Sequence, residues 1–428
     1  MVGMVMVVST AGGGFFGGPR GRAVTVATAS SSRVPQGRQP HPLRRGTKVK
    51  TFSSSSSSST ESNKGFGLLE WAGDLVPQPL VVKTTKFAWK EAWKTMTREL
   101  APQDGLGAYT RPNDAFVLGE DEFRDSTKVP TSGLFLYTGN ACPWCHRVSF
   151  AVKLLGLDSR VRCVQLEDDA ERATRGGWII AGRDKKRDPC FLASDLREVY
   201  ERSSPGGYVG RCTAPVLVDG NAKRILSNNS TNILRCLNHL AAGASREDWG
   251  AVNLWPAQLE DEIEEMNGYL YSNLNNAVYQ AGFSTTQDAH DAAASKVFDC
   301  LDHLEAVLGE REFLMGDKIT ASDLLLLPTL CRFDAAYAVL FKCSRRRVTD
   351  YPQLTSWMQR MFELEGSHET FDLEAAKQSY YKQLFPLNPS GIVPYGPTLS
   401  DLGVDNGLDR KVVRRGSPEF LSRVHLAP

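Results

Sequence analysis

The spacing of apolar residues changes once along the chain, and this change predicts two domains. Over residues 133–243, short apolar runs alternate with stretches in which apolar residues recur every three or four positions. These patterns predict strands at 134–137, 161–166 and 214–218, and helices from residue 143 and over 231–240. From residue 256 only helical spacing remains, over 260–274, 287–308, 320–333 and 353–364. We therefore expect an α/β domain at 133–243 and an all-helical domain at 250–388.

The first 60 residues differ in charge from the rest of the chain. They hold eight Lys or Arg residues, no Asp or Glu, and an unbroken run of serines at 53–59. A basic, acid-free opening rich in Ser, Thr and Gly is typical of an organellar transit peptide. We expect residues 1–60 to be a disordered transit peptide for the plastid stroma, with the mitochondrion as the alternative. Because the whole chain carries +1, the remainder carries −7 and offers no basic surface for nucleic acid.

Two further segments flank the expected domains. Residues 61–132 mix Trp, Pro and short apolar runs, with Trp89 and Trp93 four positions apart, so we expect an extension that packs on the core. Residues 389–428 form a C-terminal tail, and we expect its charged part beyond Gly396 to be disordered. No apolar run approaches the roughly 20 residues of a membrane span. The nine cysteines are irregularly spaced, which favours reduced thiols over a disulfide framework.

The clearest chemistry lies where the first expected strand meets the first expected helix. The sequence there is Cys142-Pro143-Trp144-Cys145, followed by His146. A thiol at the first turn of a helix faces unpaired N–H groups and the positive end of the helix dipole, and both stabilise the thiolate. Cys142 is therefore the expected nucleophile and Cys145 a candidate resolving thiol. The alternatives are a zinc site, for which no second pair of ligands is present, and two buried inert thiols. We expect no bound metal.

Three other stretches carry groups that suit a peptide-like or aromatic ligand. Ala214-Pro215 opens the third expected strand, and beside an N-terminal C-x-x-C it is typical of the thioredoxin fold, with a cis bond before the Pro. Asn229 and Ser230 precede a helix, where they either cap it or form an anion site with its free N–H groups. Tyr279 and Tyr380 offer hydroxyls to an aromatic substrate, although a lone Tyr usually serves packing.

These residues resemble the Xi class of glutathione transferases, the glutathionyl-hydroquinone reductases. The resemblance runs from about Leu68 to Pro397, and its segments 68–71 and 99–103 resemble the plant and algal branch. Its colinear blocks are C-P-W-x-H-R at 142–147, G-W at 177–178, G-R-C-T-A-P-V-L at 210–217, V-Y-Q-A-G-F at 278–283, R-F-D at 332–334, F-K-C at 341–343 and N-P at 388–389.

The resemblance implies a thioredoxin-like domain followed by an all-helical glutathione transferase domain, in a homodimer. It implies that glutathione reduces glutathionyl-hydroquinones to hydroquinones through a mixed disulfide on Cys142. By position, the residues that hold glutathione would be Trp178, Ala214, Pro215, Asn229 and Ser230, and those that face the aromatic ring would be Tyr279, Tyr380 and, as a weaker candidate, Tyr337.

The chain departs from the family pattern at four positions. The replacements are Cys145 for the usual Ala, Asn229 for Glu, Ser379 for His and Leu340 for His. The lost Glu puts recognition of the glutathione ammonium in question, and the added Cys opens a dithiol route. Three functions follow: a glutathionyl-hydroquinone reductase, a glutaredoxin-like thiol transferase that uses Cys142 and Cys145, and a protein that binds aromatic ligands without turnover.

Overall fold

The computed structural model describes residues 77–169, 171, 177–180, 188–243, 250–404 and 411–427. The expected transit peptide at 1–60 lies outside these residues. The chain divides into two compact units, one of which covers Val8–Phe87 while the other contains Ala88–Pro428. The helix α2 (Gln78–Leu100) crosses this boundary. The site described below lies entirely in the larger unit.

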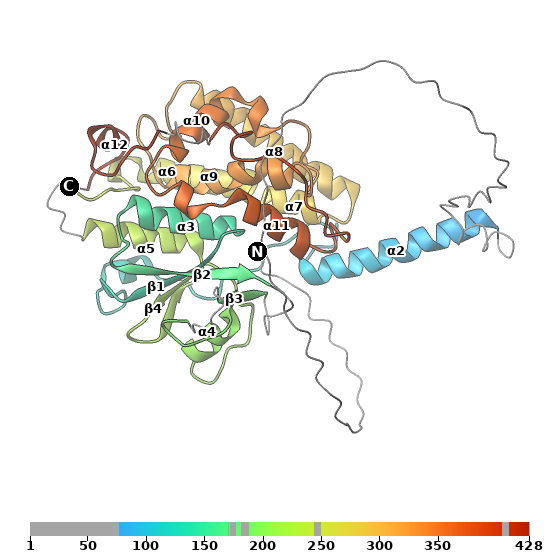
Figure 1. Ribbon diagram of the computed structural model, residues 1–428, viewed down its shortest axis with the longest axis horizontal. Helices are drawn as coiled ribbons and strands as arrows, with labels where there is room; N and C mark the ends of the chain where they lie inside the picture. Colours follow the sequence, from blue (N-terminus) through green and yellow to red (C-terminus); the bar gives the residue numbers. More distant parts are fainter. Residues whose placement is uncertain are drawn as a thin grey trace, which may run out of the picture. The chain divides into compact units, whose positions relative to one another are not determined.

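A five-stranded mixed sheet forms the centre of the first domain (Figure 1). Its strands, in the order β3-β2-β1-β4-β5, are β1 (Leu134–Gly139), β2 (Val161–Asp168), β3 (Trp178–Ile180), β4 (Val216–Asp219) and β5 (Arg224–Ser227). β1 and β2 run parallel, whereas β3, β4 and β5 each join the sheet antiparallel. The three predicted strands are present. The sequence did not predict β3 and β5, whose three and four residues show no alternating pattern of their own.

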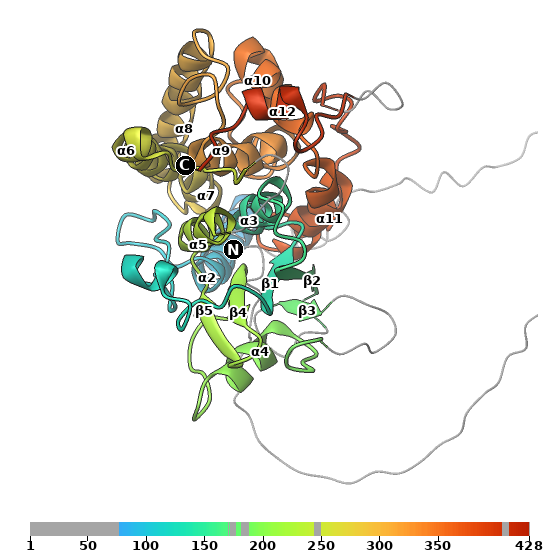
Figure 2. The ribbon, with the colours of Figure 1, turned by 90° about the vertical axis from the view of Figure 1, so that its left-hand side faces the viewer.

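Helices cover both faces of this sheet. α3 (Pro143–Leu154) and α5 (Ser230–Ala242) lie between the sheet and the helical domain, and α4 (Leu196–Ser203) lies against the opposite face (Figures 1 and 2). α3 contacts both α5 and, from the helical domain, α9 (Ala321–Arg332), so nearly all of its residues are buried. A parallel strand–helix–strand unit followed by an antiparallel pair that opens with a Pro is the thioredoxin-like arrangement, which confirms the predicted fold class.

The second domain is built of helices. They are α6 (Glu260–Leu270), α7 (Ala277–Phe283), α8 (Gln287–Leu308), α9 (Ala321–Arg332), α10 (Pro352–Phe362) and α11 (Leu373–Gln383), with π-helical turns η3 (Tyr271–Asn275) and η4 (Phe333–Tyr337) after α6 and α9. Short 3-10 turns are η1 (Glu120–Arg124), η2 (Ala257–Leu259), η5 (Val348–Asp350) and η6 (His368–Thr370). Every residue of α9 is buried. This helix is therefore the core element of the domain, and its last residue faces the other domain.

The expected disorder beyond Gly396 is wrong for residues 397–404 and 411–427, which have a defined structure. The tail contains a short helix, α12 (Pro418–Ser422), and single β-bridges join Val413 to Leu364 and Val424 to Ile319. Val413 and Val424 are also buried. The tail is polar on average, but a few spaced apolar residues suffice to hold it on the helical domain, and average composition does not reveal them.

In the described part of the extension before β1, buried apolar side chains are found from Leu100 onward. The apolar side chains buried there are Leu100, Ala101, Tyr109, Leu118, Phe123 and Val129. Trp89 is 58% exposed and Trp93 is half-buried. The segment from the end of α2 to β1 therefore packs on the core, and its loop reaches the site described next.

Candidate functional site

Cys142 is fully buried at the N-cap of α3. Its Sγ accepts a hydrogen bond of 3.3 Å from the backbone N–H of Cys145. Burial raises the pKa of the Cys142 thiol, whereas hydrogen bonding with Cys145 and, as a smaller contribution, the positive charge of Arg332 lower it, and this pKa lies well below its ordinary value. A lower pKa increases the share of thiolate, which is the nucleophilic form of a cysteine.

Cys145 has the opposite character. It is 1% exposed, and burial together with the neighbouring Cys142 raises its pKa well above the ordinary value. All nine cysteines are free. The two thiols of the C-x-x-C therefore differ in pKa. Cys142 is the more nucleophilic thiol, and Cys145 holds its proton more tightly.

Arg332, the last residue of α9, ties the helical domain to the Cys142 loop. Its Nη2 donates to the carbonyl of Asn140 at 2.7 Å, and its Nε donates to the carbonyl of Ala141 at 3.2 Å. Its guanidinium lies over the ring of Phe371, 4.3 Å from the centroid. In the described part of the chain no carboxylate forms an ion pair with Arg332. Its charge therefore acts on the thiolate of Cys142 without being neutralised by a neighbouring acid.

Three of the residues predicted to hold glutathione lie around the Cys142 loop. The Ala214–Pro215 bond is cis, as predicted, and the Ala214 carbonyl oxygen lies 3.6 Å from Cys142 Sγ. Trp178 is 2% exposed, and its ring occupies the space that a side chain at Gly139 would need. The loop that carries Cys142 thus leaves the sheet directly beside Trp178 and the cis bond.

Asn229 and Ser230 lie at the start of α5. Asn229 is the N-cap, since its Oδ1 accepts a hydrogen bond of 2.9 Å from the N–H of Asn232. Its Nδ2 donates to the carboxylate of Asp114 at 2.7 Å. Ser230 Oγ accepts a long hydrogen bond of 3.4 Å from Arg147. The extension thus brings a carboxylate to the position where the family Glu is missing.

Two arginines stack on Trp144, the residue between Pro143 and Cys145. The guanidinium groups of Arg111 and Arg147 lie over the ring of Trp144, with Cζ 4.2 and 4.5 Å from the ring centroid. Burial, and then the charge of Arg111, lowers the pKa of Arg147 to about 9. A cavity of about 250 Å³ is lined by Arg111, Asp114, Arg211 and Ala214, among others. Its two signs of charge suit a ligand that carries both a carboxylate and an ammonium.

The three predicted tyrosines meet in one cluster. Tyr279 Oη lies 2.6 Å from Tyr380 Oη and 3.3 Å from Tyr337 Oη, and Tyr337 Oη lies 3.0 Å from Tyr380 Oη. Burial raises the pKa of all three hydroxyls, that of Tyr279 and Tyr380 well above the ordinary value. The weaker candidate, Tyr337, is thus as much part of the cluster as the other two.

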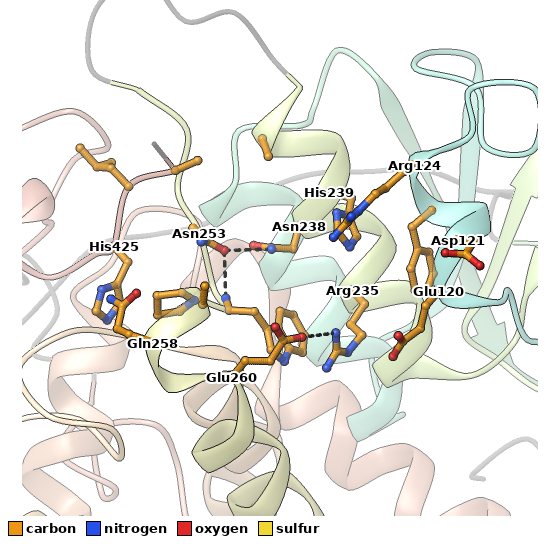
Figure 3. Close-up of a pocket in the computed structure, with 17 residues that line it drawn as sticks. Glu120, Asp121, Arg124, Arg235, Asn238, His239, Asn253, Gln258, Glu260 and His425 are labelled. Carbon is orange, nitrogen blue, oxygen red and sulfur yellow. Dashed lines mark hydrogen bonds and ion pairs between the residues drawn. The ribbon is translucent and has the colours of Figure 1, made fainter.

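A larger cavity, of about 640 Å³, shares no lining residue with these groups (Figure 3). It lies between η1, the end of α5 and the C-terminal tail. Its charged residues include Arg235 and Glu260, which pair with each other at 3.1 Å. Its described lining contains no Cys, so it holds no thiol comparable with Cys142.

The described residues contain no group of three or more His, Cys, Asp or Glu side chains placed to hold a metal ion. None of the helices in the same residues is both long and apolar enough to cross a membrane.

Sequence reasoning missed three charged residues that the fold brings to this region. Asp114 and Arg111 come from a loop with no secondary structure pattern, and no local signal connects them to α5 across more than 100 residues. Arg332 was noticed only as part of a family block. Its place at the end of an otherwise buried, apolar helix is the signal that could have identified it, because a buried charge needs a partner or a function.

Comparisons with known proteins agree with this geometry. Residues 141–240 match the family model "Glutathione S-transferase, N-terminal domain", and residues 287–360 match "Glutathione S-transferase, C-terminal domain". The glutathionyl-hydroquinone reductase PcpF of Sphingobium chlorophenolicum is 39% identical over 66% of this chain and 90% of its own.

Two solved structures are similar as well. The Xi glutathione transferase of Phanerochaete chrysosporium has a TM-score of 0.61 and 32% identity, covering 68% of this chain and 97% of its own. The glutathione-bound structure of the glutathione transferase homolog YqjG of Escherichia coli has a TM-score of 0.57 and 33% identity, covering 62% and 84%. The chain therefore belongs to the Xi class of glutathione transferases, the family of the glutathionyl-hydroquinone reductases.

Proposed function

We propose that this protein is a glutathione-dependent reductase that removes glutathione from glutathionyl-hydroquinones. The observation that carries the proposal is the state of Cys142, a buried thiol whose pKa is depressed by Cys145 and Arg332. A relative with 39% identity bears the name of this activity. Because Arg332 binds the Cys142 loop and also lies close enough to act electrostatically on Tyr337 and Tyr380, the thiolate and the tyrosine cluster belong to one site.

The reaction begins with attack of the Cys142 thiolate on the sulfur of the adduct. The bond between that sulfur and the ring carbon breaks, and its electron pair stays with the carbon, which takes up a proton. Cys142 and glutathione are then joined in a mixed disulfide. A second glutathione attacks this disulfide, releases glutathione disulfide and restores the Cys142 thiolate.

Glutathione recognition in this proposal uses the groups around the cis bond. A main-chain N–H and carbonyl at Ala214 pair with the cysteinyl part of the tripeptide, as a strand would, and Trp178 packs beside it. The N-terminus of α5 with Ser230 and Arg147 takes a carboxylate. Asp114, held by Asn229, takes the ammonium in place of the family Glu.

The tyrosine cluster serves the aromatic part of the substrate. Tyr279, Tyr337 and Tyr380 present three hydroxyls at one point, and each can donate to one oxygen and accept from another. A hydroquinone carries two hydroxyls on one ring, so it matches a cluster of this kind better than an aliphatic adduct does.

The test is an assay with glutathionyl-menadiol and glutathione. The protein without residues 1–60 should release menadiol and form glutathione disulfide in equal amounts. Cys142→Ser should lower this turnover by about 10³-fold or more, because the covalent route is lost, while glutathione binding is retained. Near-parental turnover in Cys142→Ser would refute the mechanism.

A second candidate function is a thiol transferase that uses Cys142 and Cys145 on disulfides. The observation in its favour is Cys145 itself, three residues from the nucleophile at the start of α3. Its raised pKa makes it the slower resolving group. The third candidate, ligand binding without turnover, gives no reason for a thiol with a depressed pKa.

We also propose a homodimer and a plastid location. The dimer follows from the family resemblance, and size-exclusion chromatography with light scattering tests it. The location follows from the composition of residues 1–60.

A further inference from the structure

Asp168 is the last residue of β2 and leaves the sheet at the same edge as Cys142. β1 and β2 are parallel, with Gly139 opposite Leu166. Cys142 comes three residues after Gly139, and Asp168 comes two residues after Leu166. The two strands lie about 4.8 Å apart. Asp168 also pairs with Trp178, whose ring covers Gly139. This register places Asp168 at the rim of the proposed glutathione site.

The surroundings of the Asp168 carboxyl group are unusual for an acid. Its Oδ2 accepts a hydrogen bond of 2.5 Å from Ser379 Oγ on α11. Its Oδ1 is buried and has no hydrogen-bond partner among the residues that the structure describes. In the described part of the chain no Lys or Arg forms an ion pair with it. Ser379 is one of the four positions where this chain departs from the family, and it precedes Tyr380 of the tyrosine cluster.

These surroundings determine the protonation of Asp168. Burial raises its pKa to about 7, against the lowering effect of the Ser379 hydrogen bond, and the charges of Cys142 and Asp169 act in the same direction as burial. Near neutral pH a large share of Asp168 is therefore the neutral acid. The tyrosine hydroxyls, whose pKa is raised, hold their protons too tightly to compete.

We propose that Asp168 is the general acid that protonates the ring carbon of the glutathionyl-hydroquinone when its carbon–sulfur bond breaks. This inference rests on the proposed function and adds the source of the proton that the reaction needs. Cys142 takes the glutathione sulfur, the electron pair of the broken bond remains on carbon, and the Asp168 proton joins it. Asp168 is left as a carboxylate. It regains a proton from the thiol of the second glutathione, which must lose one to attack the mixed disulfide.

The proposal separates two reactions of the same thiolate. Cleavage of a carbon–sulfur bond needs a proton on carbon, whereas exchange with a disulfide releases a thiolate that needs no acid. Asp168→Asn keeps the size and polarity of the side chain and removes only the acid. It should therefore impair the first reaction and spare the second.

The experiment is a single turnover without added glutathione. The full mature chain is mixed with glutathionyl-menadiol, and menadiol release and glutathione attached to Cys142 are followed. A parallel sample receives glutathione disulfide. In Asp168→Asn, menadiol release should be slower by about 100-fold or more, the range that general acids contribute. Its reaction with glutathione disulfide should stay within about threefold of the parent protein.

The pH dependence gives a second readout. An acid must be protonated to act, so menadiol release by the parent should fall as pH rises through about 7. Asp168→Asn should lack this fall. Ser379→Ala removes a hydrogen bond that lowers the pKa of Asp168. In this variant the decrease in the rate of menadiol release should therefore occur at higher pH. Glu167→Gln, an exposed acid on the same strand, should behave as the parent in every assay.

The outcomes distinguish failure of the role of Asp168 from failure of the proposed function. An Asp168→Asn variant that releases menadiol at the parental rate, or that loses both reactions equally, overturns the role of Asp168 and leaves the proposed function standing. A parent protein that exchanges with glutathione disulfide but never releases menadiol overturns the proposed function, and this inference with it.

Discussion

The carboxylate of Asp114 accepts a hydrogen bond of 2.7 Å from the side-chain amide of Asn229. Asp114 comes from the extension and Asn229 caps α5, so the two residues are joined only by the tertiary fold. From the sequence alone, Asn229→Glu should restore the family pattern and strengthen glutathione binding. The structure predicts otherwise, because a Glu at this position would face the carboxylate of Asp114.

We expect Asp114→Ala to raise the half-saturating glutathione concentration roughly ten- to a hundredfold. A charge-assisted hydrogen bond contributes about 1.5–3 kcal/mol, and each 1.4 kcal/mol is about tenfold in affinity. Asn229→Glu should weaken binding or leave it unchanged. Asp121→Ala, which removes an exposed acid of the same extension, is the control. Asp114 would not contact the ammonium if Asn229→Glu bound glutathione more tightly and Asp114→Ala left the half-saturating glutathione concentration unchanged.

Arg332→Met should raise the pKa of Cys142. The guanidinium supplies positive charge to the thiolate and holds the carbonyls of Asn140 and Ala141. Without it, the thiolate forms only at higher pH, so alkylation of Cys142 by iodoacetamide should titrate at higher pH than in the parent. The rate of alkylation, with mass mapping to Cys142, is the measurement.

The matched control is Arg345→Met, which removes an exposed arginine paired with Asp302. Arg332→Lys keeps the positive charge but cannot donate to both carbonyls, those of Asn140 and Ala141, in the same way. The pH at which Cys142 becomes reactive should therefore lie between the values of the parent and of Arg332→Met. The same alkylation titration in Arg332→Met and in the parent would contradict the electrostatic role.

Cys145→Ser should keep glutathione-dependent turnover within a few-fold of the parent. Cys145 is buried and its pKa is raised, so it attacks a mixed disulfide more slowly than free glutathione does. Mass spectrometry during turnover is the check. If Cys145→Ser accumulates with one glutathione on Cys142, the dithiol route operates and disulfides join the proposed substrates.

Fusion of residues 1–60 to a fluorescent reporter should deliver the reporter to plastids, with cleavage near Glu61. The reason is the basic, acid-free composition of this segment. A reporter that stays diffuse, or that collects in mitochondria, would contradict the plastid location.

The sequence by itself determined the elements whose physical cause is local. The strand before Cys142, the helix after it, the cis bond at Ala214–Pro215 and the four long helical patterns follow from apolar spacing and from the chemistry of Pro and Cys. The depressed pKa of Cys142 also follows from its place at the N-cap, because the N–H of Cys145 is only three residues away. The sequence did not predict short elements such as β3 or the structure of the tail, because a few apolar residues in a polar stretch show no periodic pattern.

Only the tertiary structure decided which distant charges join the site. Asp114 meets Asn229, Arg332 meets the Cys142 loop and Ser379 meets Asp168 across separations of 115, 191 and 211 residues. Each of these contacts depends on how a loop or a helix of one segment packs on another, and no local pattern encodes that packing. The chemistry of a buried charge depends on its neighbours, so the roles of these residues emerge only when the fold brings them together.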